Sequence, residues 1–209
     1  MRRARWSSSA CRQIAWYSWV ARSRSEGLAR AGRLLSLREI GLTLPLRHGN
    51  RSALVALACG LAFGVWMALA DATVFRAAVP EVQHVLVMQM TLVQRLARFV
   101  PGALLDEVEY RLIALTAICW LLAALTGRRG PALHWPSILL VAFVVYPLGA
   151  WGYFQQLHWS SLTVAREVVL HGGAGMLWGW LYCRHGWLAG VIGHIGAHLA
   201  LQPLLGVMA

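Results

Sequence analysis

Residues 52–70 read SALVALACGLAFGVWMALA and carry no charged side chain. An α-helix needs about 20 predominantly apolar residues to cross the hydrocarbon core of a bilayer. This stretch has about that length, and it follows directly on an arginine-rich segment, residues 1–51. It predicts a transmembrane helix.

The composition agrees with a membrane protein. Hydrophobic residues make up 58% of the 209 residues and charged residues 13%, with a mean hydropathy of +0.56. Soluble domains carry roughly 25% charged residues, so a soluble globular enzyme is disfavoured. Residues 83–100 mix polar and apolar side chains and can lie on or in the membrane, whereas longer apolar stretches occupy 102–126, 137–157, 168–183 and 187–207.

The sequence therefore predicts an all-α, polytopic transmembrane helical bundle with five to six spans. Residues 1–51 are predicted to form a basic cytoplasmic or interfacial segment, in which residues 6–20 can form an amphipathic surface helix. Residues 52–209 are predicted to form the integral membrane domain.

The formal charge of +11 points to a membrane surface as the partner. All 19 basic residues are arginines, and 11 of them lie in residues 1–51. A basic flank beside apolar spans is typical of the cytoplasmic side, where it meets anionic lipids. We expect a multi-pass protein of the inner (plasma) membrane with lipids as partners, and no nucleic acid, because no nucleic-acid-binding motif accompanies the charge.

One dense polar cluster begins an otherwise apolar stretch. Asp106, Glu107, Glu109 and Arg111 follow two leucines and precede the apolar residues 112–115. Each ionisable residue inside a span costs roughly 2.5–3.5 kcal/mol, so such residues are functional candidates. Glu107 and Arg111 are four residues apart and can pair on one helical face. An interfacial ion pair that only anchors the helix end is the alternative.

Histidines at helical spacing add to this cluster. Phe154 and His158 are four residues apart at the end of one predicted span, and His194 and His198 are four apart inside the last one. Together with the acidic face they can build one polar pocket in which a carboxylate and imidazoles activate water. His171, near Arg166 and Glu167, is a lesser candidate for the same pocket.

These residues resemble the CPBP family, the CAAX-processing and bacteriocin-processing enzymes. The family pattern is Glu-Glu-xxx-Arg, Phe-xxx-His, and His-xxx-Asn or a similar residue. The resemblance covers about residues 100–200 and includes a small-residue helix and turn before His194. The matching motifs of this chain are Asp106-Glu107-xxx-Arg111, Phe154-xxx-His158 and His194-xxx-His198.

The resemblance implies an intramembrane endopeptidase of the glutamate type, without a cofactor, that hydrolyses a peptide bond in a membrane-associated or exported protein. Residues 52–209 would then be a protease-like domain. The roles implied are activation of the attacking water by Glu107 with Asp106 and His158, donation to the oxyanion by His194 and His198, and ordering of the acidic face by Arg111.

Two departures keep alternatives open. Asp106 stands where the family has Glu, so either Asp106 or Glu107 can be the base, and His198 stands where Asn is common. A non-catalytic membrane module that binds a partner or peptide in the same cavity is the runner-up. Zinc held by three histidines and a carboxylate is a further alternative, although no HExxH motif is present. A small transporter carries less weight.

Overall fold

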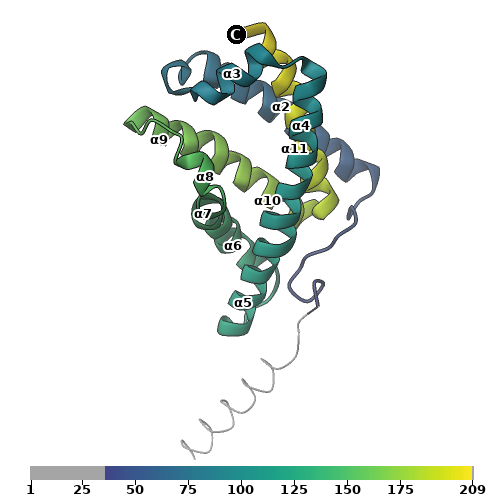
Figure 1. The fold of residues 1–209 in the computed structure, drawn as a ribbon. Coiled ribbons are helices and arrows are strands. Elements are labelled where there is room, and N and C mark those ends of the chain that lie inside the picture. The colour runs from purple at the N-terminus through teal and green to yellow at the C-terminus, as the bar shows by residue number, and fades with distance from the viewer. Residues whose placement is uncertain (1–35, 209) are drawn as a thin grey trace, which may run out of the picture. The chain divides into compact units, whose positions relative to one another are not determined.

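A computed structural model describes residues 36–208, and the amphipathic helix predicted for residues 6–20 lies outside them. The described residues fold into helices without any strand, which confirms the all-α prediction (Figure 1). The elements are α2 (Asn50–Ala72), η1 (Arg76–Ala78), α3 (Glu81–Gln89), α4 (Leu92–Asp106), η2 (Glu107–Leu115), α5 (Thr116–Thr126), η3 (Gly130–Leu133), α6 (His134–Leu140), η4 (Val141–Val145), α7 (Tyr146–Gly149), α8 (Trp151–Phe154), α9 (Ser161–Glu167), η5 (Val168–Gly172), α10 (Gly173–His185) and α11 (Trp187–Met208).

Helices α2 and α11 form the most extensive helix pair. A Cβ atom added at Gly60 would overlap the carbonyl of Gly193, and one added at Gly64 would overlap the carbonyl of Ala197. The two backbones therefore touch, as small residues allow between transmembrane helices. This pairing sets α11, which carries His194 and His198, firmly against α2.

The acidic cluster lies inside one long helix. Elements α4, η2 and α5 run without a break from Leu92 to Thr126. The predicted division of this region into the stretches 83–100 and 102–126 is therefore wrong. The true boundary is at Thr91, whose side chain and that of Gln94 form a reciprocal capping box that starts α4. Gly127 ends α5 in the left-handed conformation with φ 68°.

The next predicted span, 137–157, is displaced. The helix of η3, α6, η4 and α7 runs from Gly130 to Gly149 and breaks at Ala150. The short helix α8 then ends at Phe154. His158 follows in an irregular segment, so it does not share a helical face with Phe154 as the sequence predicted.

Elements α9, η5 and α10 form a continuous helix from Ser161 to His185. A Cβ at Gly175 would lie 2.8 Å from the Cβ of Ala142, and one at Gly179 would lie 3.0 Å from Cγ1 of Ile138. Gly175 and Gly179 therefore allow close helix packing, here against η4 and α6.

Four helical stretches of the described chain are long and apolar enough to span a membrane: Asn50–Ala72, Leu92–Thr126, Gly130–Gly149 and Trp187–Met208. The sequence predicted five to six. Residues 83–100 are no separate span, and helix 161–185 has the length to cross but a lower hydropathy, because of Arg166, Glu167 and its glycine- and tryptophan-rich middle. These four helices indicate that the described residues belong to a membrane protein.

The chain before α2 packs against the turn between α10 and α11. The amide of Trp187 donates to the carbonyl of Thr43 at 2.9 Å, and that of Leu188 to the carbonyl of Leu44 at 3.2 Å. The first amides of a helix have no partner within it. This segment supplies the missing acceptors and fixes the start of α11.

Candidate functional site

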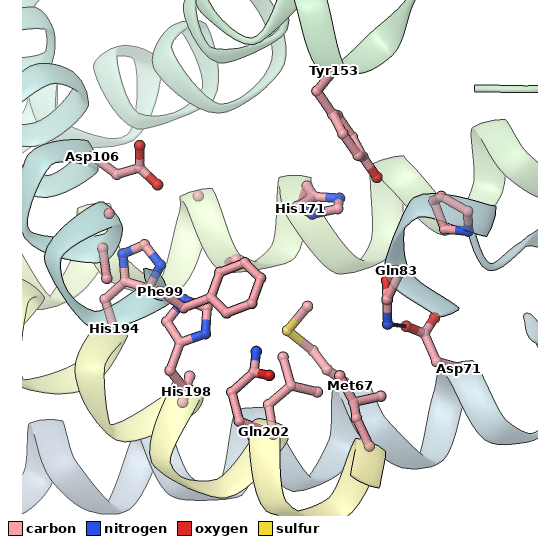
Figure 2. A pocket seen from close by; sticks show the side chains of 18 of the residues that line it. Met67, Asp71, Gln83, Phe99, Asp106, Tyr153, His171, His194, His198 and Gln202 are labelled. Carbon is pink, nitrogen blue, oxygen red and sulfur yellow. Dashed lines mark hydrogen bonds between the residues drawn. The ribbon is translucent and has the colours of Figure 1, made fainter. Parts of the chain in front are cut away.

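A cavity of about 490 Å³ lies between α2, α3, α4, α9–α10 and α11. Figure 2 shows its polar side chains facing a common space, with Asp106 and the α11 histidines toward one side and His171 and Tyr153 toward the other. The carboxylates and imidazoles in the lining, which are the side chains most used in general acid–base chemistry, are Asp71, Asp106, His171, His194 and His198. The long helix, η5 and α11 thus bring a carboxylate and three imidazoles to one cavity.

The structure separates the two candidate acids. Asp106 is partly exposed and lines the cavity, whereas Glu107 is 0% exposed and does not line it. Consecutive residues of a helix point in different directions, and of this pair only Asp106 faces the cavity. Asp106 is therefore the carboxylate placed to reach a bound molecule.

Glu107 instead supports His194 from behind. Nδ1 of His194 lies 3.1 Å from Oε1 of Glu107, and Nε of Arg111 lies 3.5 Å from the same oxygen. The predicted pairing of Glu107 with Arg111 is confirmed. A Cβ at Gly190 would lie 2.7 Å from Oε2, so this glycine makes room for the carboxylate. The indole of Trp187 donates to the backbone carbonyl of Glu107 at 2.9 Å.

Aromatic rings hold the two α11 histidines. His194 stacks on Trp178 with ring centroids 5.5 Å apart, and on His198 with centroids 5.3 Å apart. His198 stacks in turn on Phe99 at 5.5 Å, with 13° between the ring planes. These four rings fix the orientation of both imidazoles at the cavity wall.

The structure does not bring His158 to the site. His158 is exposed, follows α8, and is not among the residues that line the cavity. The predicted cavity partnership of His158 with Glu107 and His194 is therefore wrong. The physical cause is the early end of the preceding helix, which turns the chain before position 158 is reached.

His171 occupies the cavity instead, on η5, where the helix widens into a π-helical turn. Such turns occur often at functional sites. Nδ1 of His171 lies 2.6 Å from Oε2 of Glu167, one helical turn earlier. Glu167-xxx-His171 places an acid and an imidazole at helical spacing in an apolar context. This spacing is the sequence signal for the pair, and it competes with the Phe154-xxx-His158 pattern.

A second buried network, which the sequence analysis missed, surrounds Glu167. Nε and Nη2 of Arg166 donate to the two carboxylate oxygens of Asp71, both at 2.8 Å, and Nη1 donates to Oε1 of Glu167 at 2.7 Å. Nη2 also donates to Oε1 of Gln83 at 3.0 Å. The hydroxyl of Tyr153 donates to Oε1 of Glu167 at 3.1 Å. The network ties α2, α3, α8 and α9 together.

This network keeps Glu167 ionised. Nη1 of Arg166 and the hydroxyl of Tyr153 both donate to Oε1, at 2.7 and 3.1 Å, and these hydrogen bonds with the arginine charge favour the ionised carboxylate. Burial raises the pKa of Tyr153, so its hydroxyl stays protonated and donates. Glu167 is therefore a charged acceptor at neutral pH.

A different group of contacts closes the end of the cavity near α3. Arg95 is 5% exposed, and its guanidinium donates to the carbonyls of Val87, Met90 and Gln202 at 3.1, 2.8 and 2.9 Å. These bonds join α3 and α4 to α11. Arg98, one turn further along α4, lines the same end and is exposed.

Within residues 36–208, no three His, Cys, Asp or Glu side chains are grouped as they would be to hold a metal ion. The cavity groups are instead paired or stacked with protein neighbours. Comparison of the chain with protein-family models, with curated proteins and with solved structures finds no match.

Proposed function

We propose that the protein is an intramembrane endopeptidase that hydrolyses a peptide bond in a membrane-associated or exported protein. The observation that supports this best is the convergence of Asp106, His171, His194 and His198 on one cavity among apolar, membrane-length helices. A carboxylate and several imidazoles at one water-accessible place are the groups that general acid–base hydrolysis needs.

The proposed chemistry begins with a water in the cavity. Asp106 or His171 takes a proton from this water as its oxygen bonds to the scissile carbonyl carbon. His194 and His198 donate to the resulting oxyanion, a role that fixed donors perform well in a site with little water. When the intermediate collapses, the C–N bond breaks and the base returns its proton to the leaving amine.

Buried groups behind the cavity support these roles. Nδ1 of His194 donates to the Glu107 carboxylate, so His194 can donate to an oxyanion through Nε2 as an imidazolium, a form that the adjacent Glu107 carboxylate favours. Arg111 balances the charge of Glu107. The resemblance to the residue pattern of the CPBP family supports the same reaction class, with Asp106 in place of its first glutamate and His171 in the histidine role predicted for His158.

The proposal is tested by comparing protein termini, by mass spectrometry, in cells with and without the gene and in cells carrying variants. Asp106→Asn and His171→Gln are expected to lower processing by about 10²-fold to 10⁴-fold. Glu109→Gln and His158→Gln are the matched controls, because these side chains are exposed and outside the cavity lining. Both controls are expected to process normally.

Two results would overturn the proposal: identical termini with and without the protein, or normal processing by Asp106→Asn. A zinc chelator added to a detergent-purified sample that cleaves the identified substrate addresses the metal alternative. Acid–base catalysis by the chain's own groups predicts that cleavage continues, whereas the metal alternative predicts its loss.

A non-catalytic peptide-binding module is the second candidate. His198 lies between the rings of Phe99 and His194, and its Nδ1 is buried without a hydrogen-bond partner, which suits a packed wall more than a mobile donor. This candidate predicts a peptide that co-purifies equally with the unaltered protein and with Asp106→Asn, and whose mass is the same in both.

A further inference from the structure

His171 presents its two ring nitrogens to different surroundings. Nδ1 is buried and lies 2.6 Å from Oε2 of Glu167. The side chain as a whole is 27% exposed and lines the cavity, whereas that of Glu167 is only 5% exposed. Nε2 makes no hydrogen bond or ion pair among residues 36–208, and Figure 2 shows the ring of His171 beside the open space of the cavity.

An ionised carboxylate can only accept hydrogen bonds. At 2.6 Å an unprotonated Nδ1 would set its lone pair against that of Oε2, so the proton is favoured on Nδ1, and in a neutral imidazole Nε2 is then unprotonated. Glu167 cannot turn away from His171, because Arg166 and Tyr153 both donate to its other oxygen. Arg166 is itself fixed by two bonds to Asp71.

We propose that Glu167 is a positioning residue that holds neutral His171 with Nδ1 protonated and Nε2 open to the cavity as a proton acceptor. The consequence for catalysis rests on the proposed peptidase function, but the state of the ring does not. Glu167 itself touches no substrate, and it acts only through His171.

The contacts of Glu167 predict an unusual effect of Glu167→Gln. The position of Oε1 receives N–H and O–H donors from Arg166 and Tyr153, so the amide oxygen of the glutamine must take that place. The amide NH₂ group then takes the place of Oε2 and donates to Nδ1 of His171. The side chain keeps its shape, but Nδ1 becomes the acceptor and the proton moves to Nε2.

Nitrogen-15 NMR of histidine-labelled protein at pH 8 measures this directly. His171→Gln identifies the His171 signals by their loss. The unaltered protein is expected to show a protonated Nδ1 and an unprotonated Nε2, and Glu167→Gln is expected to show the reverse. Tyr153→Phe is the matched control: it removes a donor to Glu167 but keeps the carboxylate, so it is expected to leave the tautomer unchanged.

Cleavage of the substrate found by terminus comparison gives the second readout. Glu167→Gln is expected to lower kcat by about 10²-fold to 10⁴-fold with KM nearly unchanged, because a protonated Nε2 cannot accept a proton. Glu109→Gln, which is exposed and outside the cavity lining, is expected to retain its kcat.

The outcomes separate this inference from the proposed function. A protonated Nε2 in the unaltered protein overturns the inference even when Glu167→Gln does not fold. An unchanged tautomer in a folded Glu167→Gln protein also overturns it. The predicted tautomers in a protein that cleaves nothing support the positioning role and overturn the peptidase proposal alone.

Discussion

Adjacent residues Asp106 and Glu107 have separate surroundings and therefore separate roles. Asp106 faces the cavity, where a bound molecule can reach it, and Glu107 is fully buried between Arg111 and His194. Breaking a buried ion pair by removing one charge leaves the other without compensation. The two acids should therefore differ in whether their loss affects stability or activity.

Glu107→Gln is expected to destabilise the protein by about 3–5 kcal/mol, since it leaves the Arg111 guanidinium buried without its carboxylate. Thermal unfolding in detergent measures this as a clear fall in midpoint. Glu109→Gln, on the exposed face of the same helix, is expected to change stability by no more than about 0.5 kcal/mol. Equal midpoints for the two variants would contradict the structural role given to Glu107.

At the scale of elements, the backbone contact between α2 and α11 leaves no room for a side chain at Gly64. Gly64→Ala is expected to destabilise the protein by about 1–3 kcal/mol, because the added methyl group overlaps the carbonyl of Ala197.

Gly152 provides the comparison, because a Cβ there meets nothing within 4 Å. Gly152→Ala in α8 is expected to be neutral or to stabilise by up to about 1 kcal/mol. Unfolding midpoints of both variants in the same detergent test the contact. A Gly64→Ala protein as stable as the unaltered one would show that the two helices can separate freely.

The sequence predicted the helices with long uncharged runs, and it failed where helix boundaries depend on local capping. Residues 52–70 and 187–207 match α2 and α11 closely. The boundary at Thr91 comes from a capping box between two polar side chains, and the break at Ala150 lies between Gly149 and Gly152 in an otherwise apolar run. Because this break was not predicted, His158 was wrongly assigned to a helix face and to the cavity.

The candidate site was predicted in part. Asp106, Arg111, His194 and His198 were named from the sequence and do line the cavity, while Glu107 lies directly behind it. The network of Asp71, Arg166 and Glu167 was missed, because its members lie on different helices and only the fold brings Asp71 to Arg166. Spacing within one helix can indicate a pair such as Glu167 and His171, but not a contact across 95 residues.

At the scale of the whole molecule, the helix directions within residues 37–208 predict a membrane orientation. The α5 end of the long helix and the α10–α11 turn lie toward the same end as the start of α2, whereas α3 and the segment around residue 158 lie toward the other (Figure 1). Arg128, Arg129 and Arg184 are at the first end, which the positive-inside rule places in the cytoplasm.

Single cysteines at positions 129 and 158, in a protein without its own cysteines, test this orientation in intact cells. An impermeant thiol reagent is expected to label position 158 and to leave position 129 unlabelled until the cells are opened. The reverse pattern would turn the protein over and place the α3 end of the cavity in the cytoplasm.

The touching backbones of α2 and α11 also restrict how anything can reach the cavity from the lipid. A molecule can enter between two helices from the lipid when the side chains at their contact change rotamer. Gly60 and Gly64 have no side chain that could do so. Opening this seam would require whole helices to part, together with the histidines that α11 carries. A substrate that enters the cavity from the bilayer must therefore pass between α3, α4 and α9–α10.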